Sequence, residues 1–150
     1  MNVNNLPKEV ALRKPIWEKW YAKNKRRLMK MDREIMQLHL EAEKETDCLA
    51  CGNCCRSLGP MILPEDVDRM GKALRIKPSV VIERYLRTDE DGDRVFRTMP
   101  CPFLSNDNYC AIYENRPRAC REYPHTDRKK FYQIFSLSVK NAETCPIVFK

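Results

Sequence analysis

The sequence predicts a small, mainly helical α+β domain centred on its cysteines, with a short hairpin and a long N-terminal helix. Three observations predict this fold. Eight cysteines occur in 150 residues, and four of them fall between residues 48 and 55. Apolar residues recur at steps of three and four over residues 7–46, as they do along one face of a helix. An acidic turn beside a short alternating stretch predicts the hairpin. We expect a basic helical extension at residues 1–46 and a cysteine-cluster domain at residues 47–150.

The N-terminal helix is predicted over residues 7–46, with a break or a start near Lys14 because Pro15 is tolerated only in a first turn. A heptad-like stripe follows Pro15, with Asn24 as its polar interruption. Such a stripe is a packing face, because an isolated helix of this length needs a partner surface. We expect it to dock on the cysteine domain, with a homodimer as the alternative. Its members are Trp17, Tyr21, Asn24, Leu28, Met31, Ile35, Leu38 and Ala42.

Charge is polarised along this helix. Basic residues crowd its first two thirds, whereas Glu41, Glu43 and Glu45 crowd its end. A solvated face explains this pattern, and so does a basic patch that binds an acidic protein or nucleic acid such as RNA. The net charge of +7 permits such partners. His39 is interpreted as a structural or exposed residue, not as a ligand. The basic residues are Lys19, Lys23, Lys25, Arg26, Arg27, Lys30 and Arg33.

The stretch C-L-A-C-G-N-C-C places four cysteines at residues 48, 51, 54 and 55. Cys48, Cys51 and Cys54 recur every three residues, and this spacing lets successive thiolates turn inward around one metal. Gly52 and Asn53 lie where a tight loop often needs a positive φ.

The compartment decides how the cysteines are interpreted. The N-terminus lacks an apolar signal core and no run of about 18 apolar residues occurs, so we expect a cytoplasmic protein without a membrane span. Clustered cysteines in a reducing cytosol are more often metal ligands than disulfides.

A helical scaffold is predicted after this cluster, with helices starting at Pro64 and Pro78. The acidic stretch that follows resembles a calcium loop but lacks the closing glutamate, so a hairpin turn at Asp91-Gly92 is the better interpretation. Residues 94–97 then alternate as a short strand.

The remaining cysteines lie in the second half. A turn at residues 106–108 is predicted to bring Cys101 and Cys110 together in a small hairpin. Residues 131–139 are predicted to form a strand, because alternate residues share one face: Phe131, Gln133, Phe135, Leu137 and Val139. All eight cysteines are candidate metal ligands: Cys48, Cys51, Cys54, Cys55, Cys101, Cys110, Cys120 and Cys145.

An iron–sulfur cluster is the preferred cofactor. The C-x-x-C-x-x-C triplet is that of a bacterial ferredoxin, whose fourth ligand is a remote Cys-Pro; Cys101 and Cys145 both precede proline. The other Cys-Pro could then join Cys55, Cys110 and Cys120 at a second metal. Adjacent side chains diverge, so the neighbouring Cys54 and Cys55 favour two neighbouring sites.

Structural zinc is the alternative. Cys48 and Cys51 supply one zinc-type pair, but the other spacings are long and irregular. Arginines beside the cysteines could offset the charge of the thiolates in either case, or anchor an anionic substrate. His125 is an alternate ligand. The arginines are Arg56, Arg116, Arg118 and Arg121.

Several spaced motifs resemble the CxxCxxCC family, also called YkgJ-like zinc- or iron-chelating domains. They are the cysteine motif at 48–55, L-P-E-D-V at 63–67, R-Y-L at 84–86, C-P-F-L at 101–104 and C-A-I-Y-E-N-R-P-R-A-C-R-E-Y-P at 110–124. The resemblance covers roughly residues 46–148 and leaves out the N-terminal helix. It implies metal chelation with zinc or iron left open. Flagellin lysine methylases look related through the same cysteine pattern.

Three functions are compatible with these features. The first is a non-catalytic metal-binding protein, which the cysteine density and small size favour. The second is a cluster-dependent enzyme, as the methylase resemblance implies, although no glycine-rich methyl-donor site is present. The third is a zinc-stapled interaction module whose basic helix binds RNA or protein. No Ser–His–Asp set can be assembled from two histidines, and a metal-bound Cys120 is not free to act with His125 as a nucleophile.

Overall fold

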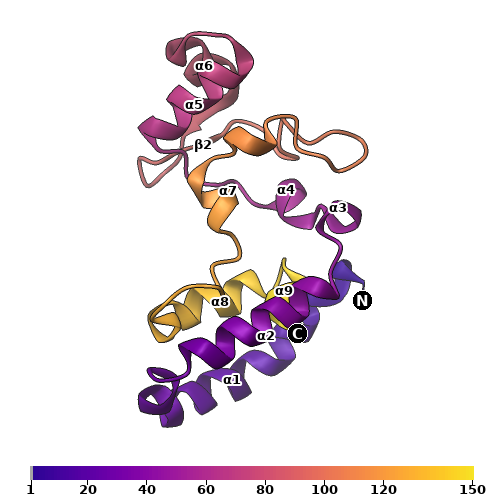
Figure 1. Ribbon diagram of the computed structural model, residues 1–150, viewed down its shortest axis with the longest axis vertical. Helices are drawn as coiled ribbons and strands as arrows, with labels where there is room; N and C mark the ends of the chain where they lie inside the picture. Colours follow the sequence, from indigo (N-terminus) through magenta and orange to yellow (C-terminus); the bar gives the residue numbers. More distant parts are fainter. Residues whose placement is uncertain (1) are drawn as a thin grey trace. The chain divides into compact units, whose positions relative to one another are not determined.

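The computed structural model describes residues 2–150 and confirms a small, mainly helical α+β chain with one two-stranded sheet (Figure 1). The longer helices are α1 (Leu6–Leu28), α2 (Asp32–Lys44), α5 (Pro64–Leu74), α6 (Pro78–Tyr85) and α8 (Phe135–Asn141). The short ones are η1 (Val3–Asn5), α3 (Cys48–Cys51), α4 (Asn53–Ser57), η2 (Tyr113–Asn115), α7 (Arg118–Glu122), η3 (Phe131–Ile134) and α9 (Pro146–Phe149). The strands are β1 (Leu86–Thr88) and β2 (Arg94–Phe96).

The chain divides into two compact units. The terminal unit comprises Met1–Cys51 and Pro124–Lys150, so it joins the two ends of the chain. The central unit comprises Gly52–Tyr123. Each unit has its own buried apolar cluster. Among residues 2–150, no helix is both long and apolar enough to cross a membrane.

The predicted helix over residues 7–46 is two helices, because a turn at residues 29–31 separates α1 from α2. The break predicted near Lys14 is wrong, since Pro15 lies inside α1. A proline there removes one helical hydrogen bond, to the carbonyl of Ala11. Ala11 and Pro15 are both exposed, so water can bind that carbonyl and the helix continues.

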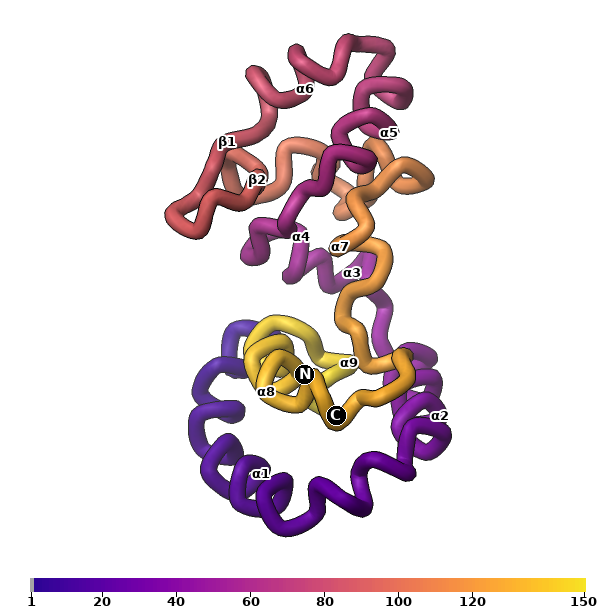
Figure 2. Tube along the Cα trace, turned by 90° about the vertical axis from the view of Figure 1, so that its left-hand side faces the viewer, coloured from indigo at the N-terminus to yellow at the C-terminus, as the bar shows by residue number. Residues whose placement is uncertain are grey.

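The predicted apolar stripe packs on the end of the same chain. The Trp17 ring meets Phe149 edge-on at 6.2 Å, and Tyr21 stacks on Phe135 at 4.2 Å. The Tyr21 hydroxyl also donates a hydrogen bond to the Tyr132 carbonyl, at 2.8 Å. Figure 2 shows the yellow C-terminal helices lying within the curve formed by α1 and α2.

Within α2 the predicted stripe holds in part. Ala42 is buried and Ile35 is half-buried, whereas Leu38, also a predicted member, is 62% exposed. The buried side of α2 includes His39 in place of Leu38. His39 was expected to be either structural or exposed, and it is structural. Its Nδ1 lies 2.7 Å from the Thr126 hydroxyl in the buried interior.

The strand predicted over residues 131–139 is wrong. These residues form η3 and the start of α8. Val139 and Ala142 are buried with Val10, and Phe135 packs against them. The spacing of 135, 139 and 142 is helical, so a short apolar run that satisfied alternation equally satisfied a helix.

The central unit is built as predicted on two helices that begin at prolines. α5 opens at Pro64, and the Asp66 carboxylate accepts the Leu63 N–H at 3.0 Å, which caps the helix. α5 ends at Leu74, and the C-cap residue Arg75, with a φ of 55°, allows the chain to turn into α6. A side chain at Gly71 would place its Cβ 2.9 Å from the Ile76 carbonyl, so glycine permits this close turn.

The predicted hairpin is present. β1 and β2 pair antiparallel with Leu86 opposite Phe96 and Thr88 opposite Arg94. Asp89 Oδ1 accepts the N–H groups of Asp91 and Asp93, and Gly92 has a φ of 86°. The acidic side chain that suggested a calcium ligand therefore closes the turn by hydrogen bonding.

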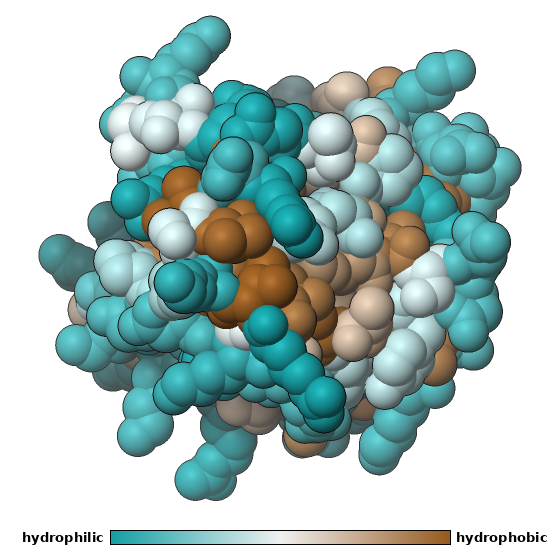
Figure 3. All heavy atoms as spheres, turned by 90° about the horizontal axis from the view of Figure 1, so that it is seen from above, coloured by the Kyte–Doolittle hydropathy of each residue, from teal (hydrophilic) through white to brown (hydrophobic). Residues whose placement is uncertain are grey.

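The core of the central unit lies between α5, α6, the hairpin and the loop after it. Phe103 packs on Tyr85 at 4.9 Å and on Phe96 at 5.7 Å. Figure 3 views the molecule from the α5–α6 end and shows hydrophobic residues grouped within a hydrophilic surround. The buried residues of the central unit's core are Ile62, Val67, Met70, Val81, Leu86, Phe96, Phe103 and Ile112.

Candidate metal centre

The cysteine motif folds as two short helical turns joined by Gly52. Cys48 and Cys51 lie at the two ends of α3, while Cys54 and Cys55 lie in α4. Gly52 has the predicted positive φ, at 53°, but Asn53 instead begins α4. A Cβ at Gly52 would lie 2.7 Å from Arg56 Nη1 and 3.0 Å from Asn108 Cγ, so this position also lacks room for a side chain.

The central unit gathers four thiols from four separate segments. Cys55 comes from α4 and Cys120 from α7. Cys110 forms a small bridge with Leu104, and Cys101 lies three residues before that bridge. The Cys101 N–H donates to the Cys55 carbonyl at 2.8 Å, which ties the two backbones together. The predicted pairing of Cys101 with Cys110 holds, since Leu104 bridges Cys110 around the turn at residues 105–108.

These four thiols affect one another's ionisation. The pKa of Cys101 is raised to about 11, chiefly by burial, and negative charge on Cys55 and Cys110 acts in the same direction. Burial likewise raises the pKa of Cys120 to about 12, with added repulsion from Cys101, Cys55 and Cys110. The pKa of Cys110 is also raised, chiefly by burial. Ionised thiols this close repel one another, and a bound cation would stabilise the ionised forms.

Cys55 is the exception in this group. A hydrogen bond from Cys54, whose sulfur lies 3.9 Å away, is the main reason that the pKa of Cys55 falls to about 6. Burial opposes this shift, while the positive charges of Arg116 and Arg56 add to it. Cys55 is therefore mostly ionised at neutral pH, in contrast to Cys101 and Cys120.

Arg116 is held in place by tyrosines. Its guanidinium lies 3.6 Å above the Tyr113 ring, and its Nε donates to the Tyr113 carbonyl at 2.8 Å. Tyr109 stacks on Tyr113 at 5.7 Å. From this position Arg116 favours the thiolates of Cys55, Cys110 and Cys120. The charge-offsetting role predicted for Arg116 is thus supported by its surroundings.

Asp66 positions the segment that carries Cys120, and sequence reasoning missed this role. Its carboxylate is 1% exposed, pairs with Arg69 and accepts the Arg118 N–H at 2.9 Å. Arg69 in turn donates to the Arg116 carbonyl at 3.3 Å. Nothing in the sequence marks Asp66 beyond its favourable place in the first turn of a helix.

The terminal unit brings three further cysteines together. Cys145 is buried at the start of α9, and its pKa is raised mainly by burial. The backbone N–H groups of Val148 and Ile147 donate to its sulfur, and charge on Cys48 and Cys51 raises its pKa further. Cys145 is therefore the Cys-Pro cysteine that lies near Cys48 and Cys51, whereas Cys101 belongs with Cys55, Cys110 and Cys120.

The other predicted residues lie as follows. Arg56 hydrogen bonds Asn108, and Arg118 pairs with Glu122 on the surface at 2.6 Å. Arg121 is exposed, and His125 adopts a φ of 68° in the terminal unit.

The donors fit a metal in their chemistry. Thiolates suit zinc and iron, and the backbone N–H groups of Phe103, Leu104 and Ile112 donate to Cys101 and Cys110, as around metal-bound sulfur. As the side chains stand, no three His, Cys, Asp or Glu residues within residues 2–150 are arranged to hold an ion. Metal binding would therefore have to draw the thiolates inward.

Comparison with protein families supplies the decisive observation. Residues 47–146 match the family model CxxCxxCC, described as "Putative zinc- or iron-chelating domain". The chain belongs to the CxxCxxCC family. The match covers two thirds of the chain and includes all eight cysteines. It supports metal binding by zinc or iron and leaves the choice between them open. Searches of curated proteins and of solved structures found no match.

Proposed function

We propose that this CxxCxxCC protein binds metal through two groups of cysteines. Cys55, Cys101, Cys110 and Cys120 form one group, and the second is built on Cys48, Cys51 and Cys145. The observation that carries the proposal is the mutual influence of four half-buried thiols of the central unit, together with the positive charge of Arg116 near them. Four thiolates complete the coordination of a zinc ion or of an iron–sulfur cluster.

An iron–sulfur cluster is the cofactor that we propose for the second group. Its support is the C-x-x-C spacing of Cys48 and Cys51 together with the remote Cys-Pro at Cys145, which is the ferredoxin pattern. Cys54 is the remaining thiol of that motif by sequence. We place the chain in the cytoplasm, where a reducing environment keeps thiolates available. Bound there, a cluster would supply redox chemistry, while the chain's residues hold it and offset its charge.

The test is the metal content and absorption spectrum of protein purified without oxygen. Iron and acid-labile sulfide, with a broad absorption band near about 400 nm, are expected for an iron–sulfur protein. Two zinc ions with a featureless visible spectrum would exclude the cluster while preserving the thiolate sites. Protein without stoichiometric zinc or iron, even after anaerobic reconstitution, would contradict the proposal as a whole.

A further inference from the structure

Positive charge is concentrated in the terminal unit. This unit carries 16 of the 28 basic residues but only 10 of the 21 acidic ones, which is +6 of the net +7. No acidic residue occurs from Lys19 to Met31, a segment that contains six basic residues counting Lys19. Charge of one sign at this density creates a local potential that attracts polyanions.

Tertiary structure adds a second segment to this charge. Asp32, at the start of α2, accepts the N–H groups of Lys130 at 2.7 Å and Phe131 at 3.2 Å. These bonds bring the loop before η3 to the end of α1. The resulting basic cluster consists of Arg26, Arg27, Lys30, Arg33, Arg128, Lys129 and Lys130, all of them exposed. Its acidic neighbours are Asp32, Glu34 and Asp127.

Part of the cluster lines a shallow hollow of about 650 Å³. Arg26, Arg27, Met29 and Lys30 line it, so three of its four residues are cations and none is acidic. Trp20 is 42% exposed and lies three and seven residues before Lys23 and Arg27, on the same side of α1. An exposed indole beside a row of cations can stack on a base while the cations contact phosphates.

We propose that the basic cluster and Trp20 bind single-stranded nucleic acid through its phosphate backbone. A second copy of the chain would present the same positive charge and be repelled. A flat bilayer would not enter a hollow. The core of a protein interface is apolar and poor in lysine, whereas Met29 is the one apolar residue lining this hollow. A strand of phosphates fits both the charge and the concave shape.

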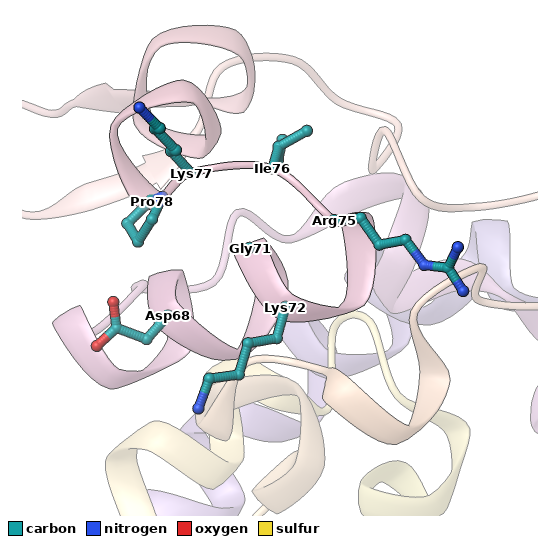
Figure 4. Close-up of a pocket in the computed structure, with 7 residues that line it drawn as sticks. All are labelled: Asp68, Gly71, Lys72, Arg75, Ile76, Lys77 and Pro78. Atoms are coloured by element: carbon teal, nitrogen blue, oxygen red, sulfur yellow. The ribbon is translucent and has the colours of Figure 1, made fainter.

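A second hollow, in the central unit, serves as the comparison. It measures about 460 Å³ and is lined by Lys72, Arg75 and Lys77 together with Asp68. Figure 4 shows the charged ends of these three basic side chains pointing in different directions around it. Basic side chains that point in different directions, with Asp68 among them, do not form a continuous positive surface for a phosphate backbone. This surface therefore provides control substitutions of equal charge.

The experiment measures fluorescence anisotropy of a labelled oligouridine of about 20 nucleotides against the full chain over a salt series. The cluster variant carries Arg26→Gln, Arg27→Gln and Lys30→Gln. We expect it to weaken binding at least ~10-fold and to reduce the slope of log K against log salt by about 2, because three phosphate contacts are lost. The control variant carries Lys72→Gln, Arg75→Gln and Lys77→Gln and should leave both quantities unchanged. Trp20→Ala should weaken binding at an unchanged salt slope.

Three results would overturn the proposal. In the first, the wild type binds oligouridine, and the control and cluster variants weaken this binding equally. That result would indicate an effect of net charge alone. Another is the same affinity for polyglutamate as for oligouridine, which would indicate an acidic protein as the partner. The third is binding to phosphatidylserine vesicles with no binding to oligouridine, which would indicate a membrane. Metal content and circular dichroism of each variant separate these results from failure of the metal site or of folding.

Discussion

At the scale of the residue, the contrast among four neighbouring thiols is the most informative feature. Burial keeps Cys101 and Cys120 protonated at neutral pH, whereas Cys54 and two arginines keep Cys55 ionised. A metal that approaches this group would therefore meet one thiolate already formed and displace protons from the others. Its affinity should rise with pH for that reason.

We predict that Cys55 is alkylated first in the metal-free protein. At pH 7 a thiol with a pKa of about 6 is mostly ionised, while one with a pKa of about 11 is almost fully protonated. The thiolate is the reactive form, so iodoacetamide should label Cys55 at least ~10-fold faster than Cys101 or Cys120. Mass spectrometry of the labelled peptides measures these rates.

The pH dependence of that labelling provides the control. Labelling of Cys55 should fall by half near pH 6, because protonation below the pKa removes the nucleophile. Cys54→Ala should move this midpoint upward, and Arg116→Gln should move it upward by less, since Cys54 is the larger cause of the shift. Equal labelling of the three cysteines at pH 7 would contradict the prediction.

A second prediction concerns Asp66. Asp66→Ala should destabilise the central unit by about 3 kcal/mol, because it leaves the Leu63 and Arg118 N–H groups without an acceptor and the partly buried Arg69 without its partner. Urea denaturation of metal-free protein measures the change. Asp68→Ala removes an exposed carboxylate of the same helix and should cost less than about 0.5 kcal/mol. Similar costs for the two variants would show that the Asp66 contacts contribute little.

At the scale of the element, α1 presents two different faces. One packs on the C-terminal segment through Trp17 and Tyr21, and the other exposes Leu12, Ile16 and Trp20 to solvent. A helix of this length is stable because of its packed face, since side chains on the exposed face bury little apolar surface.

Adjacent aromatic residues test this division. Tyr21→Ala should destabilise the terminal unit by about 2 kcal/mol, because it removes the stacking on Phe135 and the hydrogen bond to Tyr132. Trp20→Ala removes a larger but exposed side chain and should have little effect on stability. Thermal unfolding followed by circular dichroism distinguishes the two variants, and a greater loss from Trp20→Ala would refute the assignment of faces.

At the scale of the whole molecule, the cysteines are shared between two compact units. Cys120 belongs to the group in the central unit, and Cys145 is the buried thiol near Cys48 and Cys51 in the terminal unit. The family match spans both groups, so each belongs to the CxxCxxCC domain.

We therefore predict that the metal is lost in two portions. Cys120→Ser and Cys145→Ser should each remove about half of the bound metal, and the double variant should remove most of it, because each substitution deletes one ligand of one site. Elemental analysis of anaerobically purified variants measures this. Loss of all metal in either single variant would indicate one shared centre instead of two sites.

Much of the fold could be predicted from the sequence because the signals are local. Prolines at 64 and 78 begin helices, the Asp-Gly turn closes a hairpin, and Gly52 takes a positive φ, each for a reason contained in a few residues. The helical form of residues 131–139 was missed because a short apolar run fits both the two-residue period of a strand and the 3.6-residue period of a helix. The turn between α1 and α2 was missed because no glycine or proline marks it.

The sequence by itself determined the family, the mainly helical α+β class and the set of eight candidate thiols. Motifs, helical periodicity and residue types are local properties of the sequence, so they need no tertiary structure to be recognised. Tertiary structure alone decided which thiols lie near one another, because neighbours such as Cys55 and Cys101 are separated by 45 intervening residues. It also decided that Asp66 anchors the Cys120 segment and that residues 128–130 join the basic end of α1. Long-range contacts arise when separate segments bury their apolar faces together, and no local pattern records that choice.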